Sequence, residues 1–165
     1  MTMKRFFLLL IFFVLLFSNF ILSTDEFSVI GSKARVCILS YDTEFKKSMA
    51  EALIKDLNSR GISVITDNIR NIKKYSAADY DAVILLSGAM IFSPRSHAVK
   101  FIKTNNYSSN IIYVFTTSND TSPYDSLLDK KKIDAVTSAS TTEGDKEFDE
   151  VKNEIIERIM QILDK

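Results

Sequence analysis

The sequence predicts an α/β domain with a five-stranded parallel sheet and helices on both of its faces. Short apolar runs rich in valine and isoleucine alternate along the chain with segments whose apolar residues recur at helical spacing. The run YDAVILLSG lacks the period-two pattern of a half-exposed strand, as expected for a strand covered on both faces. Strand-helix alternation implies right-handed crossovers, and for five strands it favours the order 2-1-3-4-5.

The length allows one domain and an N-terminal segment. The chain has 165 residues, of which 46% are hydrophobic, and this is enough for a self-contained core. No internal repeat or second domain is visible. We therefore expect one domain over residues 34–165, preceded by a polar tether over residues 24–33.

An apolar N-terminal run predicts export. Lys4 and Arg5 precede it, and from Phe6 to Leu22 only Ser18 and Asn19 are polar. Its length lies between that of a signal peptide and that of a membrane-spanning helix, so residues 1–23 are interpreted as a signal peptide or a signal anchor. Cations before the run predict an extracytoplasmic domain, periplasmic or membrane-anchored, which contacts the membrane through this segment if it is not cleaved.

The first half of the domain reads as strand, helix, strand. Ala34–Leu39 is the first strand, and Thr43 or Asp42 can cap the helix that follows. This helix has one apolar face, formed by Phe45, Met49, Leu53 and Leu57, and a glycine, Gly61, marks its end. ISVITD is the second strand.

The second half supplies three more strands. YDAVILLSG, NIIYVFTTSND and IDAVTSAS are the third, fourth and fifth strands. Ser93-Pro94 has the residue types of a helix cap followed by a first helical position, so a helix is expected to begin there. Lys146–Asp164 is an amphipathic closing helix.

Composition excludes several kinds of site. The formal net charge is 0 and no basic stripe is present, which argues against nucleic-acid binding. His97 is the sole histidine, so a histidine-rich metal site is excluded, and we expect it to be a solvated surface residue. Cys37, between Val36 and Ile38, is interpreted as a small buried hydrophobe. No catalytic constellation and no metal site are predicted.

Three stretches resemble the flavodoxin-like family: AEALIKDLNSRGISVITD, YDAVILLSGAMIFSPRSHAVKFIK and IIYVFTTS. The likeness extends from Ala34 to Lys165. It implies noncovalent FMN binding by the loops after the first, third and fourth strands. The residues that match these loops are Ser40, Thr43, Ser87, Gly88, Ala89, Met90, Thr116, Thr117 and Ser118.

The first of these loops departs from the family pattern. A phosphate loop of the family carries hydroxyls around a glycine, whereas SYDTEFKKS has no glycine. Asp42 and Glu44 place carboxylates where a phosphate would bind, at a cost in affinity unless they point away. They are also suitable helix-start residues, because they complement the helix dipole.

Two functions remain open at this point. The resemblance implies an exported FMN-dependent redox protein that transfers electrons, or acts as a reductase, with a redox partner protein. The alternative is a cofactor-free binding or scaffold module that retained the flavodoxin-like fold. Fold alone does not choose between them.

Overall fold

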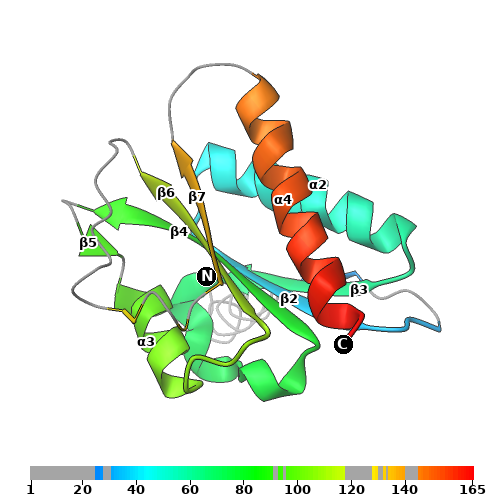
Figure 1. Ribbon diagram of the computed structural model, residues 1–165, viewed down its shortest axis with the longest axis horizontal. Helices are drawn as coiled ribbons and strands as arrows, with labels where there is room; N and C mark the ends of the chain where they lie inside the picture. The colour runs from blue at the N-terminus through cyan, green and yellow to red at the C-terminus, as the bar shows by residue number, and fades with distance from the viewer. Residues whose placement is uncertain are drawn as a thin grey trace, which may run out of the picture.

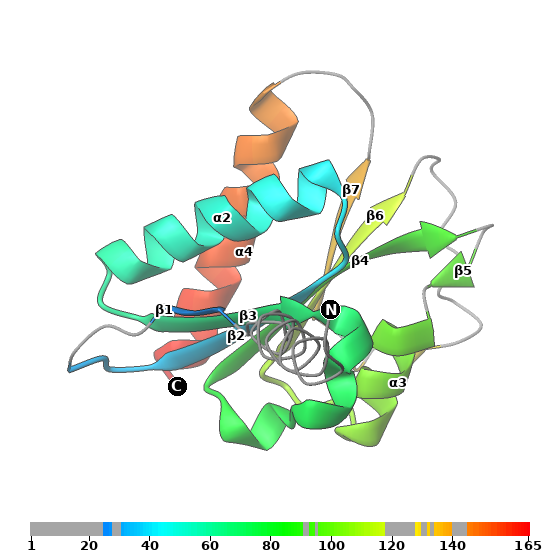
Figure 2. The same cartoon turned by 180° about the vertical axis from the view of Figure 1, so that it is seen from behind.

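A mainly parallel β-sheet separates two layers of helices in the computed structural model (Figures 1 and 2). The structure describes residues 25–27, 31–90, 93–94, 96–117, 128–129, 132, 134–139 and 145–165. The predicted signal peptide or anchor, residues 1–23, lies outside the described residues. Within the described part of the chain, no helix combines the length and apolar character needed to cross a bilayer.

Four parallel strands lie side by side in the order that the sequence predicts. They are β3 (Ser63–Asn68), β2 (Arg35–Ser40), β4 (Ala82–Met90) and β6 (Ile111–Thr117). Cys37 of β2 pairs with Ile65 of β3 on one side and with Val83 of β4 on the other. The order 2-1-3-4 is therefore confirmed for these strands.

Two further strands pair with the outer strands of this group, β6 and β3. β7 (Asp134–Ala139) pairs in parallel with β6, with Val136 opposite Val114. On the opposite side of the sheet from β7, β1 (Asp25–Phe27) pairs antiparallel with β3. β1 lies within residues 24–33, the predicted tether, where no strand was expected. Its three residues, Asp25–Phe27, are too few to show the alternation that identifies a strand.

One face of the sheet is covered by α2 (Glu44–Ser59) and α4 (Asp145–Leu163) (Figure 1). Of the predicted apolar face of α2, Met49, Leu53 and Leu57 are buried and Phe45 is partly buried, and α4 contributes a second aliphatic stripe. Phe45 and Phe148 meet edge to face between the two helices, with ring centroids 5.7 Å apart. The buried helix residues of this layer are Met49, Ala50, Leu53, Leu57, Val151, Ile155, Ile156 and Ile159.

The other face is covered by α3 (Ser96–Thr104) and by two 3₁₀ helices, η2 (Ile69–Lys74) and η3 (Ala77–Asp79) (Figure 2). Ala98, Phe101 and Ile102 of α3 pack against Val83 and Leu85 of β4 in a second cluster of buried residues. Each large aliphatic side chain buried in such a cluster stabilises the fold by about 1.5–3 kcal/mol.

The ends of α2 confirm one prediction and modify another. Gly61 has a φ of +77°, and its amide donates to the carbonyl oxygen of Asn58 at 3.0 Å, which ends the helix as predicted. At the start, Thr43 is the N-cap residue, but its side chain makes no capping hydrogen bond. Its Oγ1 instead accepts a hydrogen bond from Lys46 Nζ at 3.3 Å.

The prediction that a helix begins at Ser93-Pro94 is wrong. These residues form β5, a short strand that pairs antiparallel with Ala89 and Met90 of β4, and α3 begins only at Ser96. Proline suits a short edge strand because it has no amide hydrogen to donate. Consequently Ala89 and Met90, predicted in a loop, belong to the long strand β4.

Candidate functional site

The predicted binding residues gather at one edge of the sheet, where the carboxyl ends of β2, β4 and β6 meet. Ser40 is the last residue of β2 and pairs with Leu86 of β4. Gly88 of β4 pairs with Thr116 of β6. The three predicted loops thus start from one edge, which we call the carboxyl edge. Thr117 ends β6, whereas Ser118 lies outside the described residues.

The turn between β2 and α2 is closed by its own hydrogen bonds. Ser40 Oγ donates to the carbonyl oxygen of Tyr41 at 3.0 Å. Asp42 Oδ2 accepts from Asn68 Nδ2, at the end of the neighbouring strand β3, at 2.7 Å. Because Thr43 Oγ1 is held by Lys46, each polar side chain of the turn already has a partner.

This turn does not fit the phosphate of FMN. Only Tyr41, Asp42 and Thr43 separate β2 from α2, and no glycine lets the backbone approach a ligand closely. The hydroxyls predicted to bind, on Ser40 and Thr43, are engaged within the turn. Asp42 and Glu44 are exposed at the start of α2, where they would repel a dianion.

Asp67, near the end of β3, is the centre of a polar cluster that sequence reasoning missed. Its Oδ2 accepts from the hydroxyl of Tyr75 at 2.7 Å, and its Oδ1 accepts from Asn71 Nδ2 at 2.9 Å and from the Asn68 amide at 2.7 Å. Burial raises the pKa of Asp67, but these hydrogen bonds and the charge of Lys74 outweigh burial and hold the pKa below its ordinary value. The carboxylate therefore stays ionised and fixes the polypeptide that follows β3.

Tyr41 and His97 form a second pair that the sequence does not predict. The Tyr41 hydroxyl and His97 Nδ1 are 2.9 Å apart, and the rings meet nearly edge on, at 76°. Tyr41 is only 5% exposed, and His97 is partly buried at the start of α3. The expectation that His97 is a solvated surface residue is wrong, because a tyrosine 56 residues earlier in the chain covers it.

Ser87 has a buried hydroxyl at the same edge. Val83 and Leu85, at alternate positions of β4, face the α3 layer, so strand alternation directs Ser87 to that layer too. Its side chain is fully buried, and within the described part of the chain Oγ has no hydrogen-bond partner. A buried hydroxyl without a hydrogen-bond partner costs stability.

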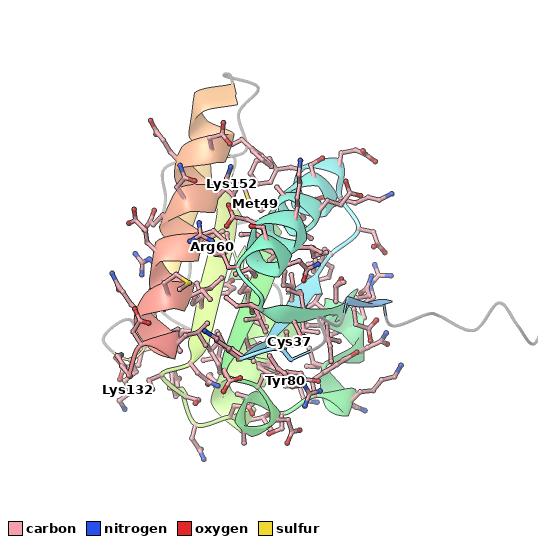
Figure 3. All side chains as sticks on the ribbon, turned by 90° about the vertical axis from the view of Figure 1, so that its right-hand side faces the viewer. Cys37, Met49, Arg60, Tyr80, Lys132 and Lys152 are labelled. Carbon is pink, nitrogen blue, oxygen red and sulfur yellow. The ribbon has the colours of Figure 1, made fainter. Side chains whose placement is uncertain are left out.

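Cys37 has no place in this site. It lies in β2 at the middle of the sheet (Figure 3) and is fully buried. Burial, with a smaller contribution from the charge of Asp67, raises the pKa of its thiol to about 12. The interpretation of Cys37 as a small buried hydrophobe is confirmed, and a reactive thiolate is excluded.

Metal binding finds no support among the described residues. No group of three or more histidine, cysteine, aspartate or glutamate side chains there could hold an ion. At the carboxyl edge, the carboxylate of Asp42 is hydrogen-bonded to Asn68.

No protein-family model and no curated protein sequence matches the chain. Solved structures do resemble it. The Flv1 flavodiiron core from Synechocystis sp. PCC6803 is 11% identical, with a TM-score of 0.57 over 82% of this chain and 37% of that one. A flavodoxin from Streptococcus pneumoniae TIGR4 is 12% identical, with a TM-score of 0.51 over 77% of this chain and 97% of that one.

A third similar structure is the response regulator domain of Thermotoga maritima CheB, which is 16% identical with a TM-score of 0.48, over 80% of this chain and 97% of that one. At such low identities the first two likenesses concern the fold alone. They agree with the strand order described above, and the chain has a flavodoxin-like fold.

Proposed function

We propose that this chain is a cofactor-free binding module that keeps a flavodoxin-like fold and binds a partner protein at its carboxyl edge. One observation carries the proposal: the turn between β2 and α2 is closed by its own hydrogen bonds, with carboxylates where the fold would place a phosphate. The fold then serves as a rigid frame for the polypeptide segments at that edge.

The charge of the edge favours a basic partner. Asp42 and Glu44, separated by Thr43, are both exposed where α2 begins. Complementary charge speeds encounter and selects against acidic partners, although exposed charges add little affinity by themselves. A partner with lysine or arginine side chains on its surface is the chemistry that this edge suits.

The place of action belongs to the same proposal. Lys4 and Arg5, followed by the apolar run Phe6–Leu22, support export, so the module would work outside the cytoplasm. If the run is retained as an anchor, it holds the module beside the membrane, where a partner in the same membrane is met at raised effective concentration.

The second candidate function is noncovalent FMN binding with electron transfer to a redox partner protein. Ser87 and Gly88 favour it, because a buried hydroxyl without a partner lies beside a residue small enough for a flat ring to approach. Lys46 Nζ, beside Thr43, could also face an anion. The carboxylates at the turn oppose this candidate.

A titration with FMN separates the two functions. The purified full chain, kept in detergent micelles because of its apolar run, is titrated with FMN while flavin fluorescence and thermal melting are followed. We expect neither quenching nor a melting shift at saturating FMN. A dissociation constant of about 1 μM with a melting shift would establish the flavin function instead.

A charge test addresses the partner chemistry. Binding of a fluorescent oligolysine peptide is measured by anisotropy at low and high salt, with the double variant Asp42→Asn/Glu44→Gln against the control Glu150→Gln/Glu157→Gln on α4. Both control residues are exposed and acidic. We expect weaker binding only for the first variant. Equal binding by both variants would contradict a basic partner at the carboxyl edge.

A further inference from the structure

The opposite edge of the sheet carries a groove that the proposed function does not use. It lies at the amino end of the strands, where the last turn of α4 reaches the starts of β2, β3 and β4; the C-terminus is marked there in Figure 1. Its volume is about 540 Å³. Cavities of roughly 300–1,000 Å³ are typical of sites for small molecules.

The floor of this amino-edge groove is apolar. It combines residues next to the first strands with the end of the closing helix: Ala34, Ile62, Met160, Ile162 and Leu163. Ile62 is buried, whereas the three residues of α4 are partly exposed. These side chains complete the core of the α2 and α4 layer on one side, and on the other they leave hydrocarbon surface open to a ligand.

The rim of the groove is charged and predominantly basic. Lys33 and Lys165 are exposed, and neither forms an ion pair with another residue that the structure describes. Arg60, labelled in Figure 3 at the end of α2, binds Asp56 through Nε, and its two terminal nitrogens make no hydrogen bond to another described residue.

The two side-chain carboxylates of the rim, Asp81 and Asp164, differ in their hydrogen bonding. Asp81 Oδ2 accepts the backbone amide of Arg35 at 2.7 Å, a bond that fixes the start of β2 against the start of β4. Asp164 is exposed at the end of α4. The side chains of the rim thus supply three cations and two carboxylates, and Lys33 and Lys165 are the cations that have no ion pair among the described residues and can meet an anionic group.

We propose that the amino-edge groove binds a small amphiphile that has an apolar chain and a single anionic group, a carboxylate or a phosphate monoester. The chain would lie on Ile62, Met160 and Leu163. The anionic group would be held by Lys33 and Lys165, and it would supply the opposite charge that these side chains lack within the described residues. This site is independent of the carboxyl edge and of whether FMN binds there.

Methionine methyl signals give a direct test. The full chain contains Met1, Met3, Met49, Met90 and Met160, of which Met160 lines the groove and Met49 is buried in the core. The chain is labelled with ¹³C-methyl methionine and titrated with octanoate, octyl phosphate, octanol or inorganic phosphate. The variant Met160→Leu assigns the Met160 signal, and Met1 and Met3 report separately on the apolar run.

The expected result is a saturable shift of the Met160 signal with octanoate and with octyl phosphate, without a shift of Met49. Octanol should bind more weakly, and inorganic phosphate should leave Met160 unmoved. Lys33→Gln should weaken octanoate binding about fivefold. The control Lys73→Gln changes an exposed lysine of η2 in the other helical layer and should have no effect.

Two results would overturn the proposal. An unmoved Met160 signal at millimolar octanoate would mean that the groove is not a ligand site. Equal affinity for octanol and octanoate, with no effect of Lys33→Gln, would mean that the groove binds hydrocarbon without recognising an anion. If the expected result is obtained, the dissociation constants of octanoate and octyl phosphate show whether the groove prefers a carboxylate or a phosphate group.

Discussion

The polar side chains at the two edges of the sheet differ in whether they bond to one another. At the carboxyl edge, side chains bond to one another: Asp42 to Asn68, Asp67 to Tyr75, and Tyr41 to His97. At the amino edge, Lys33 and Lys165 remain without an ion-pair partner among the described residues, above an apolar floor. Among the described residues, these polar groups of the carboxyl edge are therefore hydrogen-bonded to one another, whereas the two lysines of the amino edge have no ion pair.

The comparison teaches that a binding edge cannot be assigned from the fold alone. In open α/β sheets ligands bind outside the carboxyl ends of the strands, because loops and helix N-termini meet there. Here, among the described residues, Asp42, Asp67 and Tyr41 bond to other side chains at that position, whereas the buried hydroxyl of Ser87 has no partner. The predictions below test how independent the two edges are, from the largest effect to the smallest.

The largest change in stability is expected in the core beneath α2, which connects the two edges. Leu53 is fully buried in the middle of α2, a helix that starts at the carboxyl edge and ends at the amino edge. Leu53→Ala removes buried hydrocarbon and leaves a cavity, so the free energy of unfolding should fall by about 2–5 kcal/mol, measured by urea denaturation. A loss below about 1 kcal/mol would show that α2 packs more loosely than described.

A smaller and pH-dependent effect is expected at Asp67. Its pKa in the folded chain lies below the ordinary 3.8, so the carboxylate stabilises the fold above that value, and this stabilisation is lost as the pH falls through the folded pKa. Asp67→Asn should cost about 1–2 kcal/mol at neutral pH. The difference from the unchanged protein should shrink below about pH 4.

The matched control for this prediction is Asp79→Asn, which changes an exposed aspartate of η3. Urea denaturation at several pH values between about 3 and 7 is the measurement. If both variants lose the same small amount at every pH, the hydrogen bonds from Tyr75 and Asn71 contribute nothing to stability.

The core of the fold could be predicted from the sequence because its signal is local. The apolar run Val36–Leu39 and the helical spacing of Met49, Leu53 and Leu57 each fit one element, and their burial follows from that pattern. β5 could not be predicted, because Ser93-Pro94 is also the expected start of a helix and only pairing with Ala89 and Met90 decides.

The candidate site was predicted less well, because its interactions join distant residues. The residues of the first and third strand ends do meet at one edge, as expected from the parallel order. However, Asn68 lies 26 residues from Asp42, and His97 lies 56 residues from Tyr41. Sequence alone gives the hydroxyls and carboxylates but not the partners that determine what these groups can still bind.

A modest effect is expected for the pair of Tyr41 and His97. Tyr41→Phe keeps the buried ring and removes the hydroxyl that faces His97 Nδ1, which should cost about 1 kcal/mol of unfolding free energy. A double-mutant cycle with His97→Phe isolates the coupling between the two side chains. Additive losses, with no coupling, would mean that the 2.9 Å contact does not stabilise the carboxyl edge.

The smallest effect is expected at Ser87, and it has the opposite sign. Its hydroxyl is fully buried with no hydrogen-bond partner among the described residues, so folding removes Oγ from water without compensation. Ser87→Ala should therefore leave stability unchanged or raise it by up to about 1 kcal/mol. A loss above about 1 kcal/mol would instead indicate that Oγ is satisfied in the folded protein, by water or a ligand. Repeating the measurement with FMN present decides between these two, because only a ligand that bonds Oγ makes the loss depend on FMN.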